Sequence, residues 1–157
     1  MIFVVWLHLL AAVAWIGGML FVSLVLVPVF KRDGFVGERR ALFQTLALRF
    51  RMVAWASILT LVATGSMLLT SRMGSLAEPA GWPFVLKLKL ALVAILIGLT
   101  AAHDFWLGPW VGQLMRGSSA DRSATEHMLI RLSPWVARLG LILALVILLL
   151  AVAVVRT

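Results

Sequence analysis

The chain has 157 residues, of which 63% are hydrophobic and 13% charged, and its mean hydropathy is +1.09. A soluble domain of this length needs far more charge, so the composition excludes a soluble globular protein and indicates an integral membrane protein. The net charge is +8, but nucleic acid is excluded as a partner because the basic residues lie mainly in linkers between apolar runs. That pattern is typical of charges facing the cytoplasm and anionic lipid headgroups.

The first apolar run, about residues 2–28, is long enough to cross a membrane as a helix. It has no basic segment before it and no A-x-A-like cleavage site after it, which favours a helix of the mature protein over a signal peptide. At about 100° per residue, His8, Trp15 and Met19 fall on one stripe of this helix. The pair Gly17-Gly18 favours the close approach of another helix.

The linker 31–51 is rich in arginine and leads to a second span at about 52–70. Its segment "ERRALFQTLALRFRM" has an apolar and a basic face, which predicts an interfacial amphipathic helix running into the span. In the span itself, a stripe of hydroxyl and thioether side chains recurs at helical spacing and faces one direction. It consists of Ser57, Thr60, Thr64 and Met67.

The third and fourth spans are expected at about 84–108 and 137–155. "EPAGWP" predicts a turn before the third span, with Pro83 near its first turn. "GSSADRSATEH" predicts a polar loop before the fourth, with His127 in solvent. Lys89 and His103 share a stripe of the third span, whereas the fourth has no polar side chain between Arg138 and Arg156 and is interpreted as structural.

These elements predict an all-α, integral membrane four-helix bundle, with the interfacial helix before its second span. The whole chain, 1–157, is expected to form a single domain, and the sequence shows no convincing internal repeat. Because linkers 31–51 and 113–138 carry most of the basic residues, the positive-inside rule places them in the cytoplasm. Both termini are then on the periplasmic side of a bacterial inner membrane.

Ionisable side chains within spans are costly and mark candidate sites. His8 lies roughly 8 Å below the outer boundary of its span at helical rise, and Lys89 lies about as deep. Thr64 and Met67 come near the outer end of the second span, so the four residues share one level. His103 is roughly 21 Å from Lys89 along the third span and is a candidate for a second site.

Two chemistries fit this outer cluster. Imidazole and thioether ligands suit Cu(I), with His8, Met67 and Met19 as the candidate ligands, and the chain has no cysteine. Alternatively, His8 binds haem b as an axial ligand, with Lys89 or Met67 as a possible second ligand and with Trp15 and Thr64 beside it. In a third interpretation the protein is a structural or assembly subunit, and His8 only forms a hydrogen bond with Thr64. Motifs for hydrolysis or nucleotide chemistry are absent from the sequence.

"WLHLLAAVAWIGGMLF" followed by "LVLVPVF" resembles the first helix of CopD-type copper resistance membrane domains. "KLAL" at 89–92 and "RLS" at 131–133 are similar to further segments of that family. The four-helix HemJ group, which binds haem and is linked to protoporphyrinogen oxidation, has a similar layout. The CopD resemblance implies copper binding and translocation near the outer face, with His8 as lead ligand and Lys89 as a polar or gating group. It implies a binding or transport protein rather than an enzyme, with a periplasmic copper carrier, a partner membrane subunit or a second copy as partner.

Overall fold

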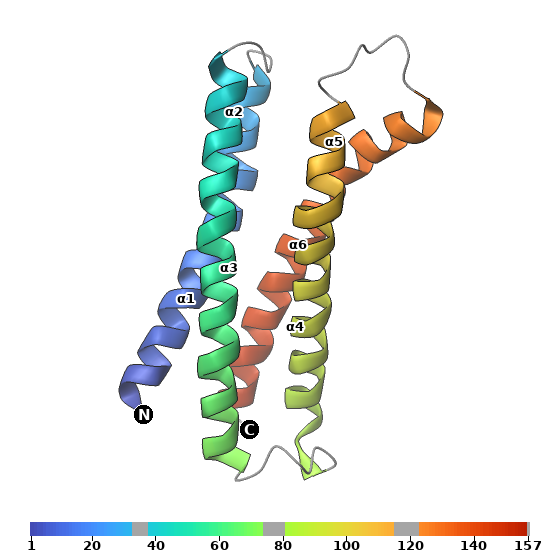
Figure 1. Ribbon diagram of the computed structural model, residues 1–157. Coiled ribbons are helices and arrows are strands. Elements are labelled where there is room, and N and C mark those ends of the chain that lie inside the picture. Colours follow the sequence, from blue (N-terminus) through green and yellow to red (C-terminus); the bar gives the residue numbers. More distant parts are fainter. Residues whose placement is uncertain (33–37, 74–80, 115–122, 157) are drawn as a thin grey trace. The chain divides into compact units, whose positions relative to one another are not determined.

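The computed structural model describes residues 1–32, 38–73, 81–114 and 123–156, and nearly all of them are helical. The chain divides into two compact units, Met1–Trp82 and Pro83–Thr157, each of which is described by itself. The first contains α1 (Ile2–Phe21), the π-helix η1 (Val22–Leu26), α2 (Val27–Arg32) and α3 (Glu38–Met73) (Figure 1). The second contains α4 (Phe84–Ala102), the π-helix η3 (His103–Leu107), α5 (Gly108–Leu114) and α6 (Ala124–Arg156). The prediction of a single domain stays a prediction.

Four helical segments in the described part of the chain are long and apolar enough to cross a membrane, which confirms the predicted all-α membrane fold class. They are Ile2–Phe30, Ala41–Arg72, Phe84–Leu114 and Thr125–Ala153. With 29 to 32 residues each, they measure about 44 to 48 Å at helical rise. A hydrocarbon core is only about 30 Å thick, so the helices extend beyond it. The predicted spans were shorter because they followed hydropathy alone.

The starts of α3 and α6 can be compared with the prediction. The amphipathic segment runs directly into the second span, as predicted, because α3 continues without a break for 36 residues from Glu38. In the fourth helix, residues 124–127 were predicted as loop but are helical. Ser123 and Glu126 form a reciprocal capping box there, with Ser123 N donating to Glu126 Oε2 at 2.8 Å and Glu126 N to Ser123 Oγ at 3.3 Å. The rest of that predicted loop, 117–122, lies outside the described residues.

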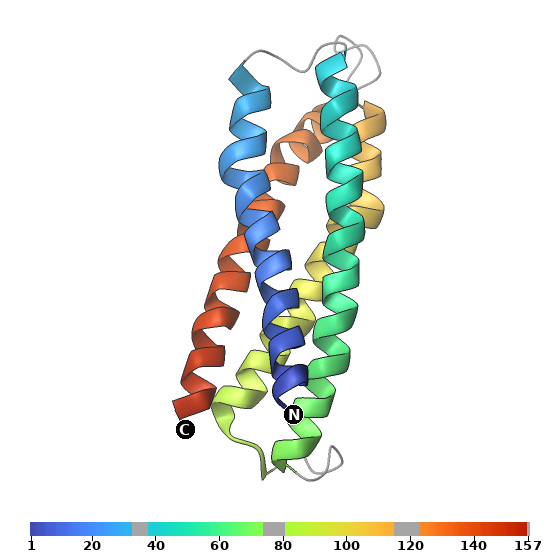
Figure 2. The ribbon, with the colours of Figure 1, turned by 90° about the vertical axis from the view of Figure 1, so that its left-hand side faces the viewer.

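In the first unit, α1 and α2 run antiparallel to α3 and form a helical hairpin (Figure 2). Three cross-helix contacts fix the register. His8 meets Thr64 near one end, Gly18 meets Phe50 further along, and the rings of Phe30 and Phe43 pack edge to face at 5.5 Å. The buried residues between the two helices of this hairpin are mostly small or aliphatic. They are Ala11 and Trp15 on α1, Leu26 on η1, and Ala54, Ser57, Ile58 and Thr64 on α3.

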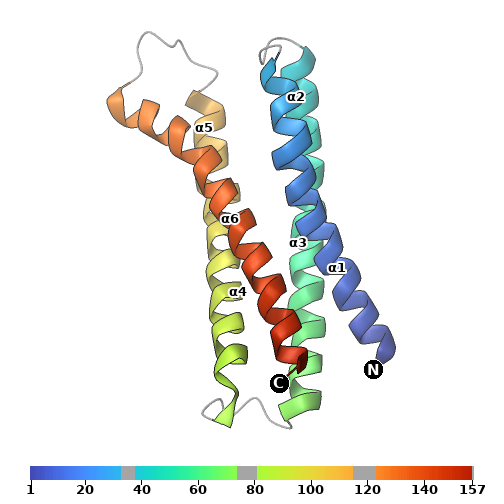
Figure 3. The ribbon, with the colours of Figure 1, turned by 180° about the vertical axis from the view of Figure 1, so that it is seen from behind.

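In the second unit, α4 and α6 pack together and form the second hairpin (Figure 3). Leu86 and Leu96 on α4 are buried, and so are Gly140 and Ala144 on α6. Gly140 and Ala144 are one helical turn apart on the same face, so they allow the backbones to approach closely, as small residues do in membrane helix pairs.

Both hairpins interrupt their first helix with a π-helix that is followed, two residues later, by a proline: Pro28 after η1 and Pro109 after η3. Proline has no N–H and its ring displaces the carbonyl one turn earlier, so the preceding turn widens. Val27 N–H accordingly bonds to Val22 O, and Gly108 N–H bonds to His103 O, each across five residues. The two units therefore share an element order and a π-helix position, a repeat that the sequence did not reveal.

Candidate functional site

His8 on α1 forms a cross-helix hydrogen bond with Thr64 on α3. The distance from His8 Nδ1 to Thr64 Oγ1 is 2.7 Å. Thr64 is 5% exposed, and the His8 side chain is half-buried. This hydrogen bond is the one expected in the third interpretation of the sequence, in which His8 has a structural role. The bond links positions 56 residues apart and fixes both the depth and the facing of the imidazole.

The second hydrogen bond of Thr64 determines which imidazole nitrogen carries the proton. Thr64 Oγ1 lies 2.6 Å from the carbonyl oxygen of Thr60, one turn earlier on α3. A threonine hydroxyl has a single hydrogen, and the carbonyl can only accept, so that hydrogen points to Thr60. Thr64 Oγ1 must then accept from His8 Nδ1–H. In the neutral imidazole the lone pair is on Nε2, the nitrogen that a metal would bind.

Gly65 makes room for the imidazole against α3. A Cβ at this position would lie 3.4 Å from His8 Cε1 and 4.0 Å from His8 Nδ1. The imidazole therefore packs against the backbone of α3 at Gly65. The Cβ of any other residue at this position would contact the ring. Sequence reasoning missed Gly65; the only signal was a small residue directly after Thr64.

Trp15 and Met19 lie further along α1 from His8. Trp15 is 6% exposed and belongs to the buried core of the hairpin. Met19 is half-buried and follows His8 by three helical turns, about 16 Å at helical rise. The two residues share the stripe of His8 but not its level in the hairpin.

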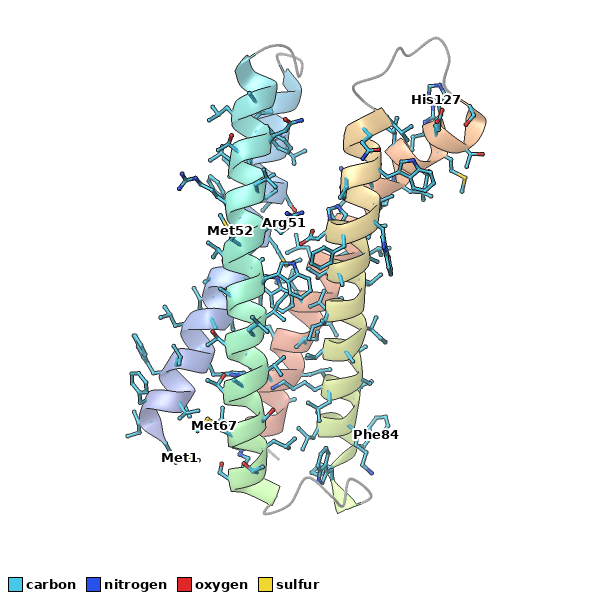
Figure 4. The ribbon with its side chains drawn as sticks, in the orientation of Figure 1. Met1, Arg51, Met52, Met67, Phe84 and His127 are labelled. Atoms are coloured by element: carbon cyan, nitrogen blue, oxygen red, sulfur yellow. The ribbon has the colours of Figure 1, made fainter. Side chains whose placement is uncertain are left out.

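Met67 lies one helical turn beyond the level of His8 on α3, at about 4.5 Å from Thr64 at helical rise. It follows Thr64 by one turn on α3 and is 53% exposed. Figure 4 shows Met67 at the end of the hairpin where Met1 lies, which is the end that carries His8. Met67 thus follows the residue that holds the imidazole by one turn, with its side chain largely exposed.

Lys89 and His103 belong to the second unit. Lys89 is half-buried on α4, whereas Lys87 is exposed. Lys89 precedes η3 by the same 14 positions by which His8 precedes η1, so it occupies in its hairpin the place of His8 in the first. Its predicted proximity to His8 stays a prediction. His103 opens η3 and pairs with Asp104 across 3.1 Å between Nδ1 and Oδ1.

A preformed site with several hard or borderline ligands is not found in the described part of the chain. Those residues contain no group of three or more histidine, cysteine, aspartate or glutamate side chains placed to hold a metal ion.

The four apolar helices define a multi-pass integral membrane protein. Residues 10–120 match the family described as Domain of unknown function (DUF4149), and the chain belongs to this family. The chain is also 28% identical over 102 residues to an uncharacterized protein of Aquifex aeolicus (strain VF5). That similarity covers 65% of this chain and 66% of the Aquifex protein, just under two thirds of its length. No solved structure matches the chain significantly. These comparisons show neither the CopD nor the HemJ family.

Proposed function

We propose that this protein binds Cu(I) near the outer face of the bacterial inner membrane, with His8 as the lead ligand. The observation that carries the proposal is the pair of hydrogen bonds through Thr64, which holds His8 as the Nδ1–H tautomer. Histidines that ligate metals almost always donate their other ring N–H to a fixed acceptor, which sets the orientation of the ring. Thr64 and Thr60 supply that arrangement here.

The donor set near His8 favours a soft, low-coordinate ion. Imidazole and thioether suit Cu(I), and Met67 lies one turn from Thr64 on the same helix. The sequence has no cysteine, so no thiolate would hold the ion too tightly for transfer. Lys89, at the equivalent position of the second hairpin, is the proposed polar or gating group, and Met19 is too far along α1 to share an ion with His8.

Copper is cargo in this proposal, so the protein acts in binding and transfer rather than as an enzyme. A periplasmic copper carrier would deliver or accept the ion. A second copy or a partner membrane subunit would complete a path across the bilayer. The basic linkers place both termini on the periplasmic side by the positive-inside rule.

The test is a Cu(I) competition titration of the full-length protein in detergent under anaerobic conditions, against a chromophoric Cu(I) chelator. We expect the wild type to bind Cu(I), His8→Gln to abolish binding and Met67→Leu to weaken it. Thr64→Val should weaken binding about 10- to 100-fold, as loss of a second hydrogen-bonded partner does at metal sites. Matched controls are Thr70→Val, whose hydroxyl bonds only within α3, and Met52→Leu, which is 65% exposed further along that helix.

The alternative is a haem b-binding oxidoreductase of HemJ type, because the same tautomer presents Nε2 for axial ligation. An absorption spectrum of the same preparation, as isolated and after dithionite, separates the two. A Soret band that His8→Gln removes would refute copper and establish haem. If the wild type binds neither, and His8→Gln changes only stability, the His8–Thr64 bond is purely structural and both proposals fail.

A further inference from the structure

The first part of α6, residues 124–134, turns away from the rest of its hairpin, and we call it the α6 arm (Figures 1 and 3). Pro134 lies inside the helix, where its missing N–H and its ring bend the chain. The capping box of Ser123 and Glu126 closes the arm at its start. Since α6 has 33 residues, about 50 Å at helical rise, it is too long to lie wholly within a hydrocarbon core of about 30 Å. Because the arm carries Glu126, His127 and Arg131, we expect it to lie at the membrane surface.

Arginine and large apolar side chains share one side of the arm and of the next turn of α6, as far as Arg138. His127, Arg131 and Arg138 follow one another at helical spacing, and Met128, Leu132 and Trp135 form the adjacent stripe. Met128 is 60% exposed and Trp135 58%. Between the stripes runs an open groove of about 430 Å³, lined by His127, Met128, Arg131, Leu132 and Trp135. Figure 4 shows His127 on the outer part of the arm.

Within the described residues, neither Arg131 nor Arg138 forms an ion pair, and the guanidinium of Arg138 stands 5.1 Å above the Trp135 ring. A cation–π contact keeps the charge accessible while it holds Trp135 in place. The face therefore offers unneutralised positive charge directly beside exposed apolar side chains.

We propose that the α6 arm, together with the turn that follows it to Arg138, binds an anionic phospholipid of the leaflet in which it lies. Arg131 and Arg138 contact the headgroup phosphate, Trp135 sits at the glycerol level, and Met128 and Leu132 contact the upper acyl chain. Charge complementarity selects this occupant, because tryptophan beside arginine is typical of the membrane–water interface and cations there attract anionic lipid. The inference is independent of the copper proposal, since it uses no residue of the first hairpin.

The experiment is native mass spectrometry of the full-length protein in detergent, titrated separately with phosphatidylglycerol and with phosphatidylcholine of the same acyl chains. We expect tighter binding of phosphatidylglycerol, and a loss of about fivefold in that preference for each arginine removed in Arg131→Gln and Arg138→Gln. The matched control is Arg49→Gln, an exposed arginine on α3. Circular dichroism confirms that each variant retains its helices.

Three outcomes would overturn the proposal. Equal affinity of the wild type for the two lipids would mean that the face does not recognise anionic headgroups and covers a protein or a second copy. An unchanged preference in Arg131→Gln and Arg138→Gln would place the lipid elsewhere. An equal loss in Arg49→Gln would mean diffuse attraction by the basic chain rather than a site on the arm.

Discussion

The contact between Gly18 and Phe50 predicts that two neighbouring glycines respond in opposite ways to the same substitution. A Cβ at Gly18 would overlap the Phe50 ring, with Cδ2 and Cζ at 3.0 Å and Cε2 closer still. A Cβ at Gly17 would have nothing within 4 Å outside its own helix. Gly17→Ala therefore gains helix propensity, up to about 1 kcal/mol. Gly18→Ala makes the same gain but must displace the ring, at about 1–3 kcal/mol for overpacking.

The difference in unfolding free energy between the two variants isolates this contact, because propensity cancels. We expect Gly18→Ala to be less stable than Gly17→Ala by about 1–3 kcal/mol. Unfolding of the full-length protein in mixed micelles by titration with a denaturing detergent, followed by circular dichroism, measures it. Adding Phe50→Leu to Gly18→Ala should recover part of the loss, a coupling that a double-mutant cycle detects. Equal stability of the two alanine variants would refute the close approach of α1 and α3 at this level.

Two further predictions concern the hydrogen bond and the orientation. Thr64→Val removes the acceptor of His8 Nδ1–H, so the same unfolding titration should show a loss of about 0.5–2 kcal/mol, while Thr70→Val stays within about 0.5 kcal/mol of the wild type. A stability of Thr64→Val equal to that of Thr70→Val would contradict the bond. Because the chain has no cysteine, Ser71→Cys and Thr125→Cys provide single labelling sites at opposite ends of their hairpins. A membrane-impermeant thiol reagent should label Ser71→Cys in intact cells and Thr125→Cys only after lysis; the reverse pattern would invert the proposed orientation.

The sequence predicted that His8 and Thr64 share a level, because depth and helical facing can both be counted along an antiparallel pair, and their hydrogen bond was expected only in the structural interpretation. It missed Gly65, since the contact of this residue with the imidazole depends on the rotation of α1 about its own axis, which hydropathy does not determine. Lys89 shows the same limit: its position in the second hairpin follows from counting, whereas its neighbours depend on packing between hairpins.

The sequence predicted the presence of the four long helices better than it predicted the residues at which they begin and end. Hydropathy placed the start of the fourth span near residue 137, but local hydrogen bonds start α6 at Ala124. The capping signature of Ser123 and Glu126 was readable in the sequence, although the surrounding polar residues favoured a loop. The repeat of the two hairpins was missed for another reason. It consists of a shared pattern of backbone hydrogen bonds and of the same spacing between each π-helix and the proline after it, Pro28 or Pro109.

Each π-helix also changes the face that its hairpin presents. A π-turn holds one residue more than an α-turn, so the side chains after it are rotated by about 100° relative to a continuous α-helix. In the first hairpin, residues on the stripe of His8 therefore keep one direction only as far as Phe21, and α2 presents a different row to α3. Along the same pair of helices, the half that carries His8 and the half that ends in basic residues are thus two separately oriented surfaces.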